Sequence, residues 1–360
     1  MGAEVSHASI DPVKSSIGAN DSELALRATS LRFSNFDLLR LIAAASVVFS
    51  HAFAVTEGHE RNEPLVMLLG AGNILGLYGV YTFFIFSGLL ITASFQKSSL
   101  SGYAIKRCLR IYPGLICCVL LTTVLALMLS SEGEVSRWKL VAGIRYATKT
   151  LLFMDTSGES LPGVVFSTND FGWLINGSLW SLGPEFLCYI AIAVLGLARL
   201  LGIWTALVLT AVGFYTHLNG LLGNLGFVLP FFFAGAVAHF WKRRPQLNVQ
   251  SFGFAVSGLV LMAVLGWPTI GFAVFGSWLI ISFATSSHQI PGATRFGDLS
   301  YGIYLYGWPI EQTVRYLLGE QATWWMVFLI SMPLAALTAC ASWHIVERPA
   351  LGMVRMTSGR

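Results

Sequence analysis

Long apolar runs fill this sequence from residue 36 to about residue 345, and they limit what the chain can fold into more than any other feature. A helix needs about 20 mostly apolar residues to cross the roughly 30 Å hydrocarbon core of a bilayer. Ten segments come close to that length. Charged residues make up 11% of the chain, against about 25% in soluble domains. The sequence therefore predicts an all-α integral membrane protein with about ten transmembrane helices.

The expected spans differ in length and are joined by connections of very different size. The fifth is short, and we expect it to be tilted, re-entrant or part of a cavity wall. The connection over residues 131–177 is the longest, and loops of that size are often lids or binding loops. The ten spans are residues 36–55, 74–95, 110–130, 178–198, 202–217, 224–241, 252–268, 270–286, 299–318 and 324–345.

The distribution of positive charge orients the chain. With ten spans both termini lie on the same side of the membrane. If that side is the cytoplasm, fifteen of the 22 lysines and arginines fall in cytoplasmic segments, six fall in outer segments and Arg40 lies within a span. This asymmetry is the one that the positive-inside rule describes. We therefore predict that both termini are cytoplasmic, and the small net charge of +4 needs no nucleic-acid partner.

The polar segments at the two ends divide the chain into three parts. Residues 1–35 are polar and irregular, so we expect a disordered cytoplasmic tail. Residues 36–346 form the expected membrane domain, and residues 347–360 form a short cytoplasmic C-terminal tail. No Cys/His spacing resembles a zinc site, so we predict no metal and no bound cofactor.

Arg40 and His51 are ionisable residues inside the first span, where such groups are costly and usually face a polar interior. Eleven helical residues separate them, so they share one face and lie about 16 Å apart along the axis. Asp37 lies one turn from Arg40 and is a candidate partner. His51 is a candidate general base, because imidazole titrates near neutral pH. The alternative is an arginine that reaches for the lipid headgroups and a structural histidine.

Two stretches after the first span also stand out, and the second of them lies at the expected cytoplasmic face. Ser87 and Gly88 are small residues in an aromatic helix, which is typical of a close helix–helix contact in membranes. Lys106, Arg107 and Arg110 precede a proline at the start of the third span. They are either positive-inside anchors or a phosphate-binding patch with forked arginine donors.

Two further stretches place polar groups at membrane depth. Glu185 lies within the fourth span and needs a buried partner, for which His51, an arginine or a substrate is available. Trp180 and Ser181 lie one turn before it. Tyr301 and Tyr304 belong to a tyrosine-rich stretch that ends at a proline, and the alternative for it is packing in an interfacial aromatic belt.

Taken in this order over residues 36–310, the five stretches resemble the acyltransferase 3 family, the bacterial membrane acyltransferases that modify saccharides and lipids. Members carry an arginine and a histidine with this spacing, and the resemblance implies that the histidine is catalytic. Many members also have a histidine where Gly307 lies in this sequence, so a second catalytic histidine is not expected. The remaining matched positions are Phe83, Phe84, Ser87 and Gly88, then Lys106, Arg107 and Arg110, then Ser178 through Glu185.

The resemblance implies an enzyme of the bacterial inner membrane that uses acyl-CoA, most simply acetyl-CoA, as a co-substrate. We expect Arg107 and Arg110 to meet the donor phosphates and Arg40 to lie along its pantetheine arm. His51 then takes the proton of a saccharide hydroxyl, and Glu185 orients His51 as the third member of a triad. The alternative is a proton-coupled transporter or flippase of a saccharide or lipid. The sequence shows no internal repeat, which counts against that alternative.

Overall fold

The computed structural model describes residues 34–129, 137–153, 166, 169–172, 174–241, 247–286, 290 and 298–357, and every regular element among them is helical. The expected tail over residues 1–35 lies almost entirely outside the described residues. The longer helices are α2 (Ser34–Glu57), α4 (Leu75–Gln96), α5 (Leu100–Met128), α6 (Arg137–Phe153), α7 (Leu182–Leu197), α8 (Ile203–Leu218), α9 (Gly223–Phe240), α10 (Val249–Val264), α13 (Leu299–Leu318) and α14 (Trp324–Ser342). The shorter ones are α3 (Pro64–Leu69), η1 (Gly177–Ser181), α11 (Pro268–Gly271), η2 (Phe272–Gly276), α12 (Ser277–Ala284), η3 (Gly319–Gln321), η4 (Trp343–Glu347) and α15 (Arg348–Thr357).

Each of the ten predicted spans coincides largely with a helix or with consecutive helical turns. Six helices of the described chain are long and apolar enough to cross a membrane: Asn35–Glu57, Leu75–Gln96, Leu100–Met128, Gly177–Leu197, Gly223–Phe240 and Trp324–Met353. Three more apolar segments are shorter, and α13 has 20 residues but buries several polar side chains. The protein is thus an all-helical, multi-pass membrane protein. The total of ten spans and the cytoplasmic location of both ends stay predictions.

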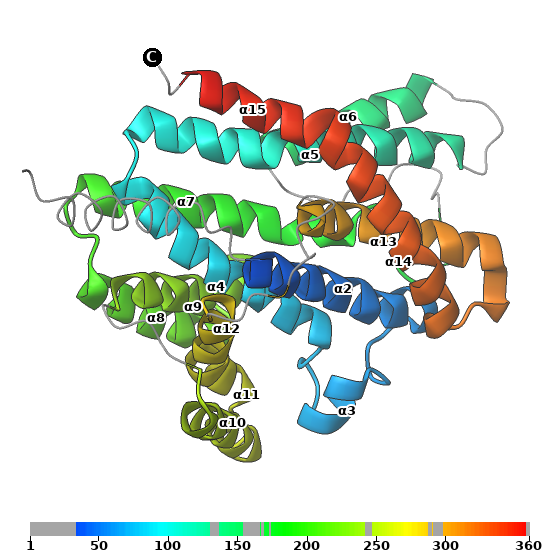
Figure 1. Cartoon of the computed structure of the whole chain (residues 1–360). Coiled ribbons are helices and arrows are strands. Elements are labelled where there is room, and N and C mark those ends of the chain that lie inside the picture. The colour runs from blue at the N-terminus through cyan, green and yellow to red at the C-terminus, as the bar shows by residue number, and fades with distance from the viewer. Residues whose placement is uncertain are drawn as a thin grey trace, which may run out of the picture.

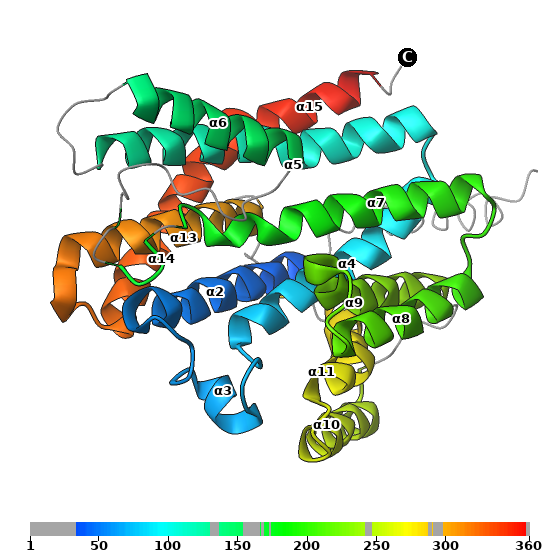
Figure 2. The same ribbon diagram turned by 180° about the vertical axis from the view of Figure 1, so that it is seen from behind.

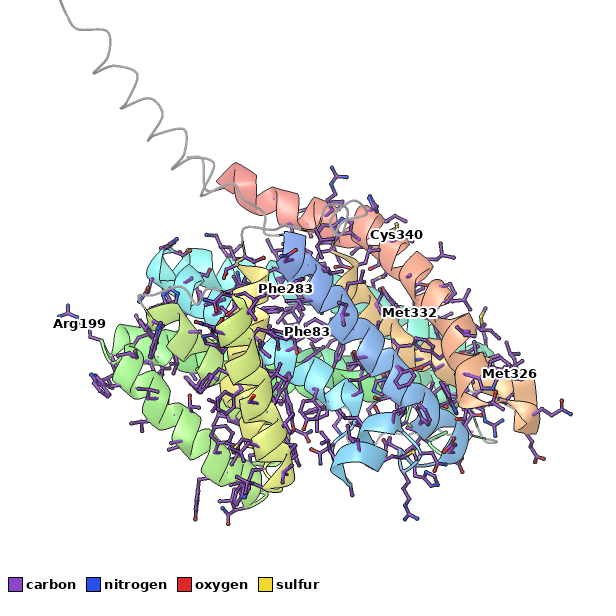
Figure 3. The ribbon with its side chains drawn as sticks, turned by 60° about the horizontal axis from the view of Figure 1, so that its bottom comes forward. Phe83, Arg199, Phe283, Met326, Met332 and Cys340 are labelled. Atoms are coloured by element: carbon purple, nitrogen blue, oxygen red, sulfur yellow. The ribbon has the colours of Figure 1, made fainter. Side chains whose placement is uncertain are left out.

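Helices α2 and α4 pack against each other in the middle of the molecule (Figure 1). On one side α4 packs against α9, which in turn packs against α8. On another side α2 packs against α13 and α14. Helices α5, α6 and α15 form the edge opposite α8 and α9, as the view from behind also shows (Figure 2). Figure 3 shows Phe83 of α4 within this bundle, whereas Arg199 points away from its periphery.

The crossing of α4 and α9 depends on two glycines. A Cβ atom added to Gly88 would collide with the carbonyl oxygen of Phe232, and one added to Gly235 would collide with that of Ile85. The two backbones therefore touch, which only glycine permits at these positions. The interpretation of Gly88 as a close helix–helix contact is confirmed, whereas its neighbour Ser87 turns toward a cavity.

The long outer connection expected over residues 131–177 contains a helix that we did not predict. Helix α6 packs alongside α5, with Gly143 against Thr123 (Figure 2). The expected outer connection is therefore helical, not a loop, over Arg137–Phe153. Four basic residues lower the hydropathy of α6 below the level of a span, although Tyr146 and Thr150 are buried. Likewise, the expected C-terminal tail begins as α15, which contacts α5.

Candidate active site

A cavity of about 130 Å³ lies between α2, α4, α5, α7 and α13. Its wall gathers side chains that are far apart in the sequence, and most of the predicted site residues are among them. Those residues are Arg40, Ser87, Arg107, Arg110, Ser181, Glu185, Tyr301 and Tyr304. The other lining residues are mainly aromatic and aliphatic, with Phe83, Phe84 and Phe86 from α4. The cavity therefore combines an apolar surface with a few converging polar groups, as small-molecule sites do.

One carboxylate forms ion pairs with two arginines at one end of this cavity. Asp298 Oδ2 lies 2.6 Å from Arg40 Nη1 and 2.5 Å from Arg110 Nη2. Ser300 donates a hydrogen bond to the other oxygen, Oδ1, at 2.7 Å. Burial alone would raise the pKa of Asp298, but the charges of Arg110 and Arg40 hold it well below its usual value. Asp298 thus links α2, α5 and the start of α13.

The other two basic residues of the predicted phosphate patch have different surroundings. The Arg107 guanidinium lies 5.9 Å from the centre of the Tyr189 ring and lines the cavity, and its buried Nε has no hydrogen-bond partner among the described residues. Lys106 Nζ instead donates to Ser98 Oγ at 2.9 Å and does not line the cavity. Among the described residues, Arg107 therefore lines the cavity without a carboxylate partner, whereas Arg110 is paired with Asp298.

Glu185 lies in the cavity wall and has two hydroxyl partners. Its Oε1 accepts hydrogen bonds from Ser87 Oγ at 2.7 Å and from the Tyr189 hydroxyl at 2.6 Å. We expected Glu185 to orient His51, but the carboxylate next to His51 is a different one, described below. The expectation failed because Glu185 sits on α7, which meets α4, whereas His51 on α2 faces α13.

The tyrosines of α13 are interior residues rather than members of an aromatic belt. The Tyr304 hydroxyl lies 2.6 Å from Ser181 Oγ, and its ring meets that of Phe83 edge to face. The Tyr301 hydroxyl donates to the carbonyl oxygen of Ile111 at 2.7 Å. Both rings line the cavity, so the belt alternative does not apply to Tyr301 and Tyr304.

His51 lies beyond this cavity, further along α2. Its ring packs edge to face on the Trp308 indole at a centroid distance of 4.8 Å, one helical turn beyond Tyr304 on α13. His51 Nδ1 is 3.7 Å from Glu311 Oε2. The Glu311 side chain is 0% exposed, and neither of its oxygens has a hydrogen-bond partner among the described residues. His51 itself keeps 16% of its side-chain surface exposed.

Two of these acidic residues were missed in the sequence. Glu311 lies inside the ninth expected span, so the test that selected Glu185, an ionisable group at membrane depth, applies to it as well. Asp298 directly precedes that span and was treated as part of a connection. Both pair with residues of the first span, more than 250 positions away, and local spacing carries no sign of that.

The structure places two supporting residues apart from the cavity. Asp37 occupies the first turn of α2, one turn before Arg40. Trp180 faces a second cavity, of about 350 Å³, together with side chains from α5, α6, α7 and α9. The neighbouring residues Trp180 and Ser181 of η1 therefore face different cavities.

Comparison with known proteins relates the chain to membrane acyltransferases. The family model described as an acyltransferase domain, acyltransferase 3, matches residues 33–346. A protein of Shigella phage Sf6 named O-acetyl transferase is 28% identical over 337 residues, covering 87% of this chain and 94% of its own. Nodulation protein 10 of Rhizobium leguminosarum bv. viciae is 26% identical over 360 residues, covering 88% and 93%. No solved structure matches the chain.

The family match spans every residue of the cavity wall as well as the His51 and Glu311 pair. The resemblance expected from the five sequence stretches is thereby confirmed, and the chain belongs to the acyltransferase 3 family of membrane acyltransferases.

Proposed function

We propose that this enzyme moves an acetyl group from cytoplasmic acetyl-CoA to a hydroxyl of a lipid-linked or cell-surface saccharide at the opposite side of the bacterial inner membrane. The arrangement along α2 carries the proposal: the arginine-lined cavity surrounds Arg40, and His51 lies about 16 Å further along the same helix. The relative named O-acetyl transferase supports the choice of acyl group and of an oxygen acceptor.

The cavity suits the donor at its charged end and along its wall. Arg107 offers a forked, permanently charged group for a phosphate of the donor. Phe83, Phe84 and Tyr304 supply an apolar wall against which the pantetheine arm can pack. We propose that the arm runs past Tyr304 toward Trp308, which lies one turn further along α13 and packs on His51, so that the thioester reaches the imidazole. Positive charge at one end and a histidine beyond the other match a donor that enters from the cytoplasm.

The chemistry assigned to His51 is general base catalysis. Nδ1 faces Glu311, which leaves Nε2 for the substrate. Nε2 takes the proton of the acceptor hydroxyl while the oxygen attacks the thioester carbonyl. A carbon–oxygen bond forms, the carbon–sulfur bond breaks, and the imidazolium returns its proton to the departing CoA thiolate. One ester and one CoA thiol result, with no other reactant.

We expect His51→Ala to lower acetyl transfer by roughly 10²-fold or more, because a positioned base contributes 10²–10⁴-fold. The enzyme is purified into lipid nanodiscs with acetyl-CoA and a membrane glycolipid extract, and release of the CoA thiol is followed with mass spectrometry of the glycolipid. His217→Ala, a change of a half-buried histidine on α8, is the matched control.

Full activity of His51→Ala would overturn the proposal. Saccharide transport into proteoliposomes without consumption of acetyl-CoA would also overturn it and would support the transporter alternative. A mass gain of one acetyl group on a named sugar identifies the acceptor.

A further inference from the structure

We propose that Glu311 is the positioning partner of His51, and that the contact between Gly307 and Val48 sets the distance between the two side chains. This inference rests on the proposed function of His51 as the base. It assigns a role to a carboxylate that the predicted mechanism did not use, and to Gly307, one turn before that carboxylate on α13.

The surroundings of Glu311 single out His51 as its partner. A carboxyl group that is fully buried without a hydrogen-bond donor is costly, so its position calls for an explanation. The only cation-forming group within 4 Å of it among the described residues is His51, at 3.7 Å. Arg315 lies one turn further along α13, but its guanidinium donates to the carbonyl oxygen of Gly319 instead.

The pair fits the demands of the transfer step. With the proton on Nδ1 facing Glu311, the Nε2 lone pair is free for the acceptor hydroxyl. When Nε2 takes that proton, the imidazolium gains a carboxylate counter-ion in a water-poor site, where such an interaction is strong. If His51 Nδ1 and Glu311 Oε2 move about 1 Å closer, they form a charge-assisted hydrogen bond. Glu311 thus acts through His51 and does not touch the substrate.

Helices α2 and α13 also touch one turn before the His51 and Glu311 pair, where Gly307 faces Val48. A Cβ atom on Gly307 would lie 2.8 Å from Val48 Cγ2, closer than carbon atoms pack. Val48 precedes His51 by three residues, and Gly307 precedes Glu311 by four. The contact therefore lies one helical turn before the pair on both helices. A larger side chain at position 307 has to displace the Val48 side chain or move α2 and α13 apart. Gly307 is therefore a spacer that allows Glu311 to reach His51.

The first experiment measures kcat and KM for acetyl-CoA with Glu311→Gln. We expect kcat to fall by 10- to 100-fold, as changes of orienting partners do, with KM unchanged. Glu311→Asp should recover part of kcat, and Glu311→Gln should cost nothing further in the His51→Ala background. Glu57→Gln is the matched control, because Glu57 lies 3.8 Å from His59 Nδ1 outside the site.

The second experiment tests the spacer without touching either member of the pair. Gly307→Ala should lower kcat by about tenfold or more, and adding Val48→Ala, which removes the colliding methyl group, should restore most of it. Gly253→Ala on α10, where a Cβ meets nothing within 4 Å, is the control. Activity is expressed per folded molecule, determined by size-exclusion chromatography and thermal unfolding.

The outcomes separate this inference from the proposed function. An active His51→Ala variant overturns the proposed function itself. With His51→Ala inactive, wild-type kcat in Glu311→Gln overturns the role of Glu311 alone. A fully active Gly307→Ala variant, or one that Val48→Ala does not rescue, overturns the role of the spacer.

Discussion

Asp298 is the residue on which the charged end of the cavity depends, because Arg40 and Arg110 share one of its oxygens. Removing the carboxylate leaves the two neighbouring, largely buried guanidinium groups of Arg40 and Arg110 without their shared counter-ion. Arg107 lies on the same cavity wall and pairs with a tyrosine ring instead. Arg40 and Arg110 therefore hold helices together through Asp298, whereas Arg107 is the arginine that we propose meets the acyl donor.

We expect Asp298→Asn to lower the free energy of unfolding by about 3 kcal/mol, as the loss of one partner of a buried ion pair does. Since the folded-state pKa of Asp298 lies below its unfolded value, the contribution is complete above roughly pH 4 and is lost as the pH falls below it. The difference in unfolding temperature between variant and wild type should thus be constant from pH 8 to 5 and shrink in more acid buffer. Glu320→Gln, at an exposed position, should show no difference at any pH.

Arg107→Ala should raise KM for acetyl-CoA by about tenfold, the equivalent of 1.4 kcal/mol, with little change in kcat. Its neighbour Lys106 binds Ser98 outside the cavity, so Lys106→Ala should have a much smaller effect. Steady-state kinetics with acetyl-CoA compare the two directly. Equal effects of both variants would contradict the assignment of the donor phosphate to Arg107.

At the scale of elements, the close crossing of α4 and α9 fixes the cavity wall. Gly88 and Gly235 let the backbones touch, and the neighbouring residues Phe84 and Ser87 then face the cavity. Two adjacent residues therefore do different things: Ser87 lines the cavity, and Gly88 packs the helix pair. Packing in membranes rests on such contacts, because lipid supplies no hydrophobic drive between helices.

Gly88→Ala should destabilise the protein by about 1–3 kcal/mol, since the added methyl group meets the backbone of α9 and cannot be accommodated by a side-chain movement. Thermal unfolding in nanodiscs, followed by tryptophan fluorescence, measures the loss. Gly253→Ala provides the same chemical change in open space and should leave the unfolding temperature unchanged or slightly higher. A wild-type unfolding temperature for Gly88→Ala would count against this crossing.

For the whole molecule, the proposed reaction requires opposite sides of the membrane for the two substrates. The basic end of the cavity, the start of α2 and the segment before α13 lie together. The positive-inside asymmetry predicts that this end is cytoplasmic. The His51 end then lies toward the outer side, where the saccharide is expected.

Consumption of added acetyl-CoA should therefore occur in inside-out membrane vesicles and be nearly absent in sealed right-side-out vesicles. Detergent permeabilisation of the right-side-out vesicles should restore it. A fluorescent protein fused to the C-terminus, beyond Thr357, should become fluorescent, as expected for a cytoplasmic end. Activity confined to sealed right-side-out vesicles would reverse the predicted orientation.

The sequence by itself determined the class of the protein, the positions of the apolar helices and the candidates Arg40, His51 and Arg107. Helical periodicity and the cost of charge in a bilayer are local rules, so they can be applied along a single chain. It also contained the signals for the family, because those motifs are short and ordered. It did not reveal α6, because four basic residues lower the hydropathy of that helix below the level of a span.

Only the tertiary structure decided which acidic residue meets which basic one. Asp298 joins Arg40 across 258 positions, and Glu311 rather than Glu185 lies beside His51. Such pairings follow from which helices pack together and how closely, and close packing depends on contacts such as that of Gly307 with Val48. A pattern read along the chain gives the face of a helix, whereas the partner of that face is set by packing of the whole bundle.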